Sequence, residues 1–405
     1  MAVGLTEPEL LLPVKGVRLS AIASGIKKNG NNDLVLIEVA ENSYSAAVFT
    51  QNKFCAAPVI LAKKHLQVAS PRYLLINSGN ANAGTGSQGM QDALQSCQRV
   101  AEQTGCKVEE VLPFSTGVIG ENLPVEKIAS ALPVLHQNLS QDQWENAGRA
   151  IMTTDTLLKG VSRQFELQGK TVTVTGLSKG GGMIQPNMAT MLAYIATDAA
   201  VSNEILQQCI KSVVRLSFNS ITVDSDTSTN DACVLIGTGR AENNLITQAD
   251  SDDYKLLLNV VMDVFIYLAQ AIIRDAEGAT KFVSLQVSAA ASESDARQVA
   301  YTVAHSPLVK TALFASDPNW GRILAAVGRA GVDFDLDKIR IYLGDVCIVS
   351  SGGRDADYTE DQGQQVMQQS EISIRIELNT GEHSCCIWTS DLSYDYVKIN
   401  SEYRS

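Results

Sequence analysis

A glycine-rich segment in the middle of the chain holds residue types that could do chemistry. It runs Lys179-Gly-Gly-Gly-Met-Ile-Gln-Pro-Asn-Met-Ala-Thr190 and leads into an apolar stretch. Three glycines beside a lysine can cradle a phosphate, but a phosphate-binding loop has the order G-x-x-x-x-G-K-[ST], and here the lysine comes first. A threonine hydroxyl becomes a useful nucleophile only when a base removes its proton. On these residues alone, a turn at Pro186-Asn187 followed by an ordinary buried strand is the better interpretation.

Further segments are rich in small polar residues that a hydrophobic core does not need. Any one of them is most simply an Asx-rich loop that satisfies its own backbone. Several such loops in one chain indicate that they converge on a site. These segments are Asn77–Gly86, Ser115–Gly120, Val223–Asp231 and Asp317–Arg322.

The elements that must position these loops alternate along the chain. Apolar and β-branched runs alternate with amphipathic stretches, which predicts an α/β protein. Gln168-Gly169 separates two predicted strands and is typical of a hairpin turn. We expect helices over Met90–Gln103, after a Ser202 cap and after Pro124. The predicted strands are Leu34–Ala40, Ser45–Thr50, Tyr73–Asn77, Val161–Leu167, Thr171–Thr175, Met191–Ala196, Cys233–Gly237, Lys281–Val287, Ile339–Leu343, Ile372–Leu378 and Cys385–Trp388.

Composition excludes several classes of function. The formal net charge of −12 over 405 residues argues against nucleic acid or an anionic membrane as the main partner. Polar residues interrupt the apolar stretch Tyr254–Ile273, so we expect a buried helix rather than a membrane span. The start of the chain does not resemble a secretory signal, and we expect a cytoplasmic protein. Eight scattered cysteines without CxxC spacing are expected to be reduced, and four isolated histidines predict no metal site.

Taken together, the polar segments resemble those of the ornithine acetyltransferase family, the bifunctional glutamate N-acetyltransferases of arginine biosynthesis. The segment from Lys179 to Thr190 is similar to the family's self-cleavage site. The family usually has glycine where this chain has Ser225 and Ala276, which matters if those backbones need a positive φ. Other departures are Gly84 and Gln185. The matching blocks, which follow family order almost throughout the chain, include Val48–Asn52, Asn77–Gly86, Thr153–Thr156, Ile221–Asp231, Glu277–Lys281, Asp317–Ile323 and Asn400–Ser405.

The resemblance implies a fold and a maturation step. The expected fold is a layered αββα sandwich, with helices outside two packed sheets. Self-cleavage between Ala189 and Thr190 would divide the molecule into residues 1–189 and 190–405, two intertwined chains rather than independent domains. The resemblance also implies a heterotetramer of two such pairs.

The resemblance further implies a ping-pong acetyl transfer. Cleavage would free the α-amino group of Thr190 as a base, because its ordinary pKa of about 7.7–8.0 leaves part of it neutral near pH 7. Thr190 would take the acetyl group from N-acetylornithine and pass it to glutamate. Thr116 and Gly117 would form the oxyanion hole.

Substrate contacts are carried over by position in the family motifs. They are Thr154, with Thr153 as an adjacent alternative, Lys179, Thr190, Glu277, Asn400 and Ser405. Lys179 suits a substrate carboxylate and Glu277 an ammonium group. We expect no metal and no cofactor, and the sequence leaves open whether acetyl-CoA is a second donor. The alternatives are a self-processing N-terminal-threonine amidase or aminopeptidase, and an amino-acid-binding protein without catalysis.

Overall fold

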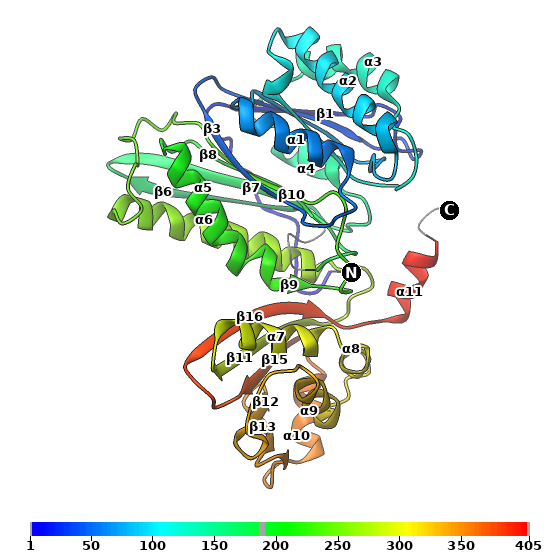
Figure 1. Cartoon of the computed structure of the whole chain (residues 1–405), viewed down its shortest axis with the longest axis vertical. Helices are drawn as coiled ribbons and strands as arrows, with labels where there is room; N and C mark the ends of the chain where they lie inside the picture. Colours follow the sequence, from blue (N-terminus) through cyan, green and yellow to red (C-terminus); the bar gives the residue numbers. More distant parts are fainter. Residues whose placement is uncertain (1, 186–190, 403–405) are drawn as a thin grey trace.

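The computed structural model describes residues 2–185 and 191–402. The first of its sheets forms the upper part of the molecule in Figure 1. Its strand order is β1-β2-β4-β5, and only β4 and β5 run parallel. Leucine, valine and isoleucine side chains on its outer face pack against three helices. The strands are β1 (Val17–Ile22), β2 (Leu34–Val39), β4 (Tyr73–Asn77) and β5 (Val111–Ser115), and the helices are α1 (Ala57–Val68), α2 (Gly86–Thr104) and α3 (Val125–Gln137).

A five-stranded second sheet lies against the inner face of the first. The two sheets share one apolar cluster, in which the Phe114 and Tyr194 rings meet edge to face with centroids 5.3 Å apart. Helices α5 (Asn203–Leu216) and α6 (Asp252–Arg274) cover its other face. The layers are therefore helix, sheet, sheet and helix, which confirms the predicted αββα fold class (Figure 1). In spatial order the strands are β3 (Tyr44–Phe49), β10 (Ala232–Gly237), β8 (Leu192–Thr197), β7 (Lys170–Lys179) and β6 (Lys159–Leu167).

The second sheet also contains strands from both sides of the predicted cleavage site. Strands β3, β6 and β7 precede residue 189, whereas β8 and β10 follow it. Segments 1–189 and 190–405 therefore both contribute strands to one sheet, and their division into two chains stays a prediction. Ala189 and Thr190 themselves lie outside the described residues.

A third, seven-stranded sheet lies outside the predicted αββα layers. It forms the lower part of the molecule in Figure 1 and has its own apolar core. The strand order is β14-β13-β12-β15-β11-β16-β9, and the parallel pairing of the short β9 with β16 connects it to the upper layers. The strands are β9 (Ile221–Thr222), β11 (Phe282–Ala290), β12 (Arg340–Leu343), β13 (Val346–Ser350), β14 (Gly353–Arg354), β15 (Glu371–Glu377) and β16 (His383–Ser390).

Six further α-helices are found in the described residues. Helix α4 (Trp144–Ile151) fills the edge between the first two sheets with Trp144 and Ile151. Helix α11 (Tyr394–Ser401) leaves the third sheet and runs alone towards the upper layers (Figure 1). The others are α7 (Glu293–Ala304), α8 (Pro307–Phe314), α9 (Trp320–Gly328) and α10 (Glu360–Met367).

Most predicted elements appear close to their predicted bounds. Each of the eleven predicted strands overlaps an observed one, and Ser202 caps α5 by accepting a hydrogen bond from the Ile205 amide. Gln168 and Gly169 both have positive φ in the β6–β7 hairpin. Helix α6 is long and apolar enough to cross a membrane by composition, yet one side packs on the second sheet through residues such as Leu257, Val264 and Leu268. All eight cysteines are free.

Candidate active site

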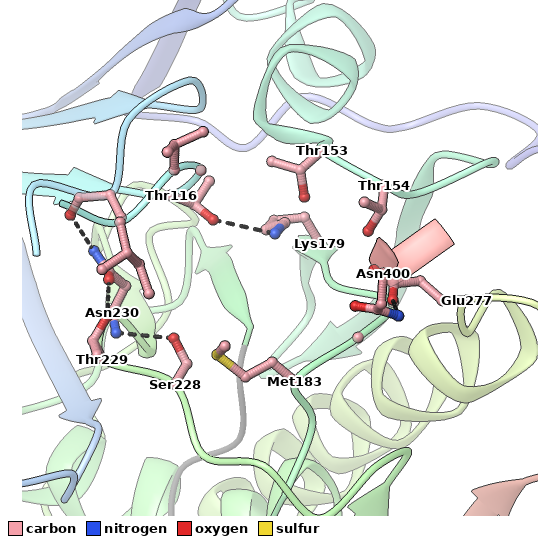
Figure 2. A pocket seen from close by; sticks show the side chains of 16 residues that line it. Thr116, Thr153, Thr154, Lys179, Met183, Ser228, Thr229, Asn230, Glu277 and Asn400 are labelled. Atoms are coloured by element: carbon pink, nitrogen blue, oxygen red, sulfur yellow. Dashed lines mark hydrogen bonds between the residues drawn. The ribbon is translucent and has the colours of Figure 1, made fainter. Parts of the chain in front are cut away.

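Loops from distant parts of the chain converge on one cavity of about 260 Å³ (Figure 2). Sites for drug-sized ligands usually measure about 300–1,000 Å³, so this volume suits a smaller molecule such as a free amino acid. Of the sequence-predicted site residues, Thr116, Gly117, Thr153, Thr154, Lys179, Glu277 and Asn400 all line it. The remaining predicted residues, Ala189, Thr190 and Ser405, lie outside the described residues.

One side of the cavity is formed by Lys179, the last residue of β7. Its ammonium group donates a hydrogen bond of 3.2 Å to the hydroxyl oxygen of Thr116 (Figure 2). Lys179 is only 6% exposed, and burial lowers its pKa, while the nearby carboxylate of Asp155 opposes that shift. Because the Thr116 backbone amide is already bonded to the Asn77 carbonyl, its hydroxyl is the group left to face the cavity.

The loop that carries Thr116 and Gly117 is held tightly against the segment after β4. Gly117 has a φ of +127°, and an added Cβ would lie 2.5 Å from the carbonyl carbon of Gly79. The Asn230 amide ties the loop down by donating to the carbonyls of Ala81 (2.6 Å) and Ser115 (2.9 Å). A rigid hydroxyl beside a glycine is the arrangement that an oxyanion hole requires.

The other end of the cavity holds the carboxylate of Glu277. It accepts a hydrogen bond of 2.8 Å from the Asn400 amide, and its own backbone N–H donates to the Gly181 carbonyl, also at 2.8 Å. An added Cβ on Gly182 would lie 2.3 Å from a Glu277 carboxylate oxygen, so only glycine allows this approach. No ion pair among the described residues includes Glu277, which leaves its charge available to a cationic ligand.

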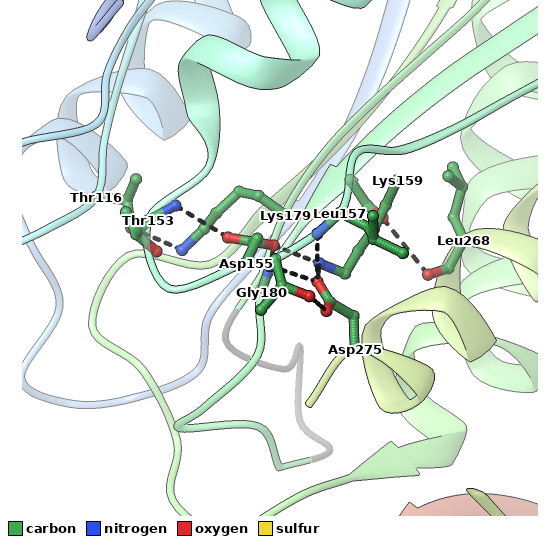
Figure 3. A network of polar contacts seen from close by, with 11 residues as sticks. Thr116, Thr153, Asp155, Leu157, Lys159, Lys179, Gly180, Leu268 and Asp275 are labelled. Atoms are coloured by element: carbon green, nitrogen blue, oxygen red, sulfur yellow. Dashed lines mark hydrogen bonds and ion pairs between the residues drawn. The ribbon is translucent and has the colours of Figure 1, made fainter. Parts of the chain in front are cut away.

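Behind Lys179 lies a buried ionic network (Figure 3). The Lys159 ammonium group contacts the carboxylates of Asp155 and Asp275, each at 2.6 Å, and all three side chains are at most 1% exposed. Asp155 also accepts hydrogen bonds from the backbone amides of Thr153 (2.9 Å) and Gly180 (2.7 Å). Burial raises the pKa of Asp155, but Lys159 and Lys179 together lower it well below its usual range. The network therefore fixes two cavity-lining segments to the end of β7.

Another buried carboxylate, Asp231, directly precedes β10, where β10 pairs with the start of β8. One of its oxygens accepts a hydrogen bond of 3.0 Å from the Met191 backbone amide. The other oxygen is buried and accepts no hydrogen bond from the described residues. Burial raises the pKa of Asp231 well above its usual range, against the opposing effects of the Met191 amide, Ser228 and Lys179. The Asp231 carboxyl group therefore holds Met191, the residue that directly follows the predicted nucleophile Thr190 in the chain.

Asp155, Asp231, Asp275 and Asn230 are site residues for which the sequence predicts no role. Asp155, Asp231 and Asn230 lie inside blocks that matched the family, and Asp275 lies two residues before Glu277. The sequence feature that could have indicated a role for Asp155 and Asp231 is an acidic residue inside a polar, threonine-rich block. Pairing Asp275 with Lys159 needed the fold, because 116 residues separate them.

Two departures from the family pattern have different outcomes. Ser225 has a φ of +66°, so this backbone does adopt the conformation that favours glycine. Ala276 is absent from the positive-φ residues, and the neighbouring Gly278 has a φ of +68° instead. The exchange at position 276 therefore causes no such strain.

Comparison with known proteins identifies the chain's relatives. The ArgJ family model matches residues 18–405. The arginine biosynthesis bifunctional protein ArgJ of Pseudomonas fluorescens is 58% identical over 406 residues, covering 100% of both proteins. The chain belongs to the ArgJ family. It is an acetyltransferase of arginine biosynthesis, which confirms the main prediction over the amidase or aminopeptidase alternative.

Two solved structures are also similar to this ArgJ family member. A crystal structure of arginine biosynthesis bifunctional protein ArgJ from Bacillus halodurans is 34% identical, with 51% of this chain and 96% of that chain covered and a TM-score of 0.49. Ornithine acetyltransferase from Mycobacterium tuberculosis, solved in complex with ornithine, is 33% identical, with 43% and 92% covered and a TM-score of 0.38.

Proposed function

We propose that this ArgJ family member transfers the acetyl group of N-acetylornithine to glutamate through an ester on Thr190. The observation that carries the proposal is the convergence of Lys179, Glu277 and Asn400, from three distant parts of the chain, on one cavity. A cation and a carboxylate facing one cavity of this size suit an amino acid that carries both charges.

Chain connectivity supports Thr190 as the nucleophile of this cavity. Leu192 pairs with Lys179 in the antiparallel register of β7 and β8, and Thr190 precedes Leu192 by two residues. Asp231 fixes the intervening Met191 amide. Self-cleavage after Ala189 would free the Thr190 α-amino group, which then serves as the base for its own hydroxyl.

The cycle has two half-reactions. The Thr190 oxygen attacks the acetyl carbonyl of N-acetylornithine, the C–N bond breaks, and ornithine leaves with the proton that the α-amino group removed from the hydroxyl. The glutamate amine then attacks the ester, and N-acetylglutamate departs as the hydroxyl is restored. Thr116 and Gly117 stabilise the negative charge on the carbonyl oxygen in both tetrahedral intermediates.

The proposal also covers a second acetyl donor and the assembly and cellular location of the enzyme. Because related proteins are named bifunctional, we include acetyl-CoA as a second acetyl donor. The two chains produced by cleavage associate as a heterotetramer with a second pair, in the cytoplasm. Thr153 and Thr154 border the cavity between Lys179 and Glu277, and both remain candidate substrate contacts (Figure 2).

The experiment follows the acetyl group on the purified protein. Incubation with N-acetylornithine alone should add one acetyl group to a fragment that begins Thr-Met-Leu, as read by mass spectrometry and N-terminal sequencing. Glutamate should then remove the label as N-acetylglutamate. Thr190→Ala should remain a single inactive chain, while Thr190→Ser serves as the control that keeps a hydroxyl. An active single-chain enzyme, or a label on another residue, would overturn the mechanism.

A further inference from the structure

Asp224 lies outside the cavity, in the loop that follows β9, and binds two separate parts of the chain. Its carboxylate accepts hydrogen bonds from the backbone amides of Met183 (2.6 Å) and Ile184 (2.9 Å) and from the Tyr396 hydroxyl (3.0 Å). The first two belong to the glycine-rich loop and the third to helix α11. The Asp226 backbone amide, in the same loop as Asp224, donates a fourth bond at 3.3 Å. These uncharged donors satisfy the Asp224 charge, and none of the ion pairs among the described residues includes Asp224.

The first contact fixes the glycine-rich loop. Ile184 is fully buried, and its carbonyl accepts hydrogen bonds from the Val223 amide (2.9 Å) and the Thr222 hydroxyl (3.1 Å). Asp224 thus completes a set of bonds that holds Ile184 at both its amide and its carbonyl. Met183 adopts a φ of +55°, which a side chain disfavours, so its bond to Asp224 stabilises a strained conformation. This loop places Gly182 against the Glu277 carboxylate.

The second contact fixes helix α11. None of its residues is fully buried, although Tyr396 packs against the upper apolar core and the Tyr394 ring meets Phe314. Polar contacts add to these to hold the helix in place. Ser393 donates to the Gly278 carbonyl at 2.6 Å, and Tyr396 donates to Asp224. Asn400 lies four residues after Tyr396 and therefore on the same face of the helix. Its amide bridges the Tyr396 carbonyl (3.0 Å) and Glu277 (2.8 Å).

We propose that Asp224 is a positioning residue for Glu277, because its one carboxylate fixes both the loop and the helix that flank the Glu277 side chain. Gly182 lies against the Glu277 carboxylate from one segment, and Asn400 donates to it from the other. Asp224 therefore sets how strongly the enzyme selects a substrate side chain that ends in an ammonium group. This inference rests on the proposed function of the cavity.

The test compares two acetyl donors in Asp224→Asn. N-acetylnorvaline has the carbon chain of N-acetylornithine without the terminal ammonium group, so the ratio of the two kcat/KM values measures recognition by Glu277. An asparagine keeps one acceptor oxygen but loses the charge, so the ratio should fall about tenfold, mainly through the KM for N-acetylornithine. A merely structural role would lower both kcat/KM values alike and leave their ratio unchanged, which would overturn the inference.

Two further variants make the test specific. Tyr396→Phe removes only the helix contact and should lower the ratio by a smaller factor, and it carries the same test if Asp224→Asn does not fold. Asp226→Asn makes the same chemical change two residues away, where no side-chain hydrogen bond reaches the loop or the helix, and should leave the ratio unchanged. Wild-type protein that fails to use N-acetylornithine would overturn the proposed function, whereas active wild type with an unaltered ratio in both Asp224→Asn and Tyr396→Phe would overturn only this inference.

Discussion

The ammonium group of Lys179 donates a hydrogen bond of 3.2 Å to the hydroxyl oxygen of Thr116. A hydroxyl has one proton to donate and can accept two hydrogen bonds. Because Lys179 occupies an acceptor position, the Thr116 proton is free to point into the cavity. Lys179 therefore orients Thr116 as a donor, a role that adds to the carboxylate contact expected from the sequence.

Removal of the Thr116 hydroxyl tests its part in stabilising the oxyanion. Thr116→Ala should lower kcat by about 10²–10³ with a smaller change in KM, because the interaction strengthens as charge develops on the oxygen. Thr116→Ser keeps the hydroxyl and should retain most of the activity. A raised KM with unchanged kcat would make Thr116 a ground-state binding residue instead. Steady-state kinetics with N-acetylornithine and glutamate provide the measurement.

Lys179→Ala should lower the kcat/KM of both half-reactions by similar factors, about tenfold to a hundredfold. The reason is that a hydrogen bond to a charged group contributes about 1.5–3 kcal/mol. Lys179→Ala, Thr116→Ala and the double variant together form a double-mutant cycle. The hydrogen bond predicts that the two effects are not additive. Strict additivity, or damage confined to one half-reaction, would show that Lys179 acts independently of Thr116.

Glu277→Gln should affect the two half-reactions unequally. The ornithine half-reaction brings an ammonium group to the carboxylate, whereas glutamate brings a second negative charge. We expect kcat/KM to fall more for N-acetylornithine than for glutamate, by about tenfold or more. Equal losses of kcat/KM in the two half-reactions, measured separately, would mean that Glu277 does not contact the substrate side chain.

Gly182→Ala provides a steric test of the same contact, with Gly181→Ala as its matched control. The added methyl group at 182 would lie 2.3 Å from the Glu277 carboxylate, whereas at 181 the nearest atom is the Asp275 carbonyl oxygen at 3.3 Å. Neither glycine has a φ in the left-handed region, so backbone strain does not separate the two. We expect Gly182→Ala to raise the KM for N-acetylornithine more than Gly181→Ala does. The opposite order would contradict the observed approach of Gly182 to Glu277.

Asp155→Asn should destabilise the protein by about 3–5 kcal/mol, because it leaves Lys159 with an incomplete set of buried counter-charges. The pKa of Asp155 is lower in the folded state than the ordinary value of about 3.9, so its stabilising effect is present above pH 4 and is lost as the pH falls below that value. Thermal unfolding should show a wild-type Tm that falls more steeply in acid than that of the variant. Asp263→Asn breaks only an exposed ion pair with Arg163 and should cost about 0–1 kcal/mol.

The sequence predicted individual strands well where apolar and β-branched runs were strong, as in β4 and β8, whereas the layered arrangement was implied by the family resemblance. It gave little signal for α11, which has no fully buried residue, or for β9, which is two residues long. Thr116, Lys179 and Glu277 could be named because they stand in distinctive peptides. Asp224 and Asp275 could not be given roles, because each acts on backbone or side-chain groups more than 35 residues away in the chain.

The shared second sheet has a consequence for how the mature enzyme would regain its structure after denaturation. Six residues of β7 pair with β8, and six of β3 pair with β10, so the sheet joins both sides of the proposed cut. The intact chain can assemble this sheet in a first-order process. Once cut, the same sheet can reform only when two separate polypeptides meet, which makes refolding depend on protein concentration. The protein would then fold as one molecule and unfold as two.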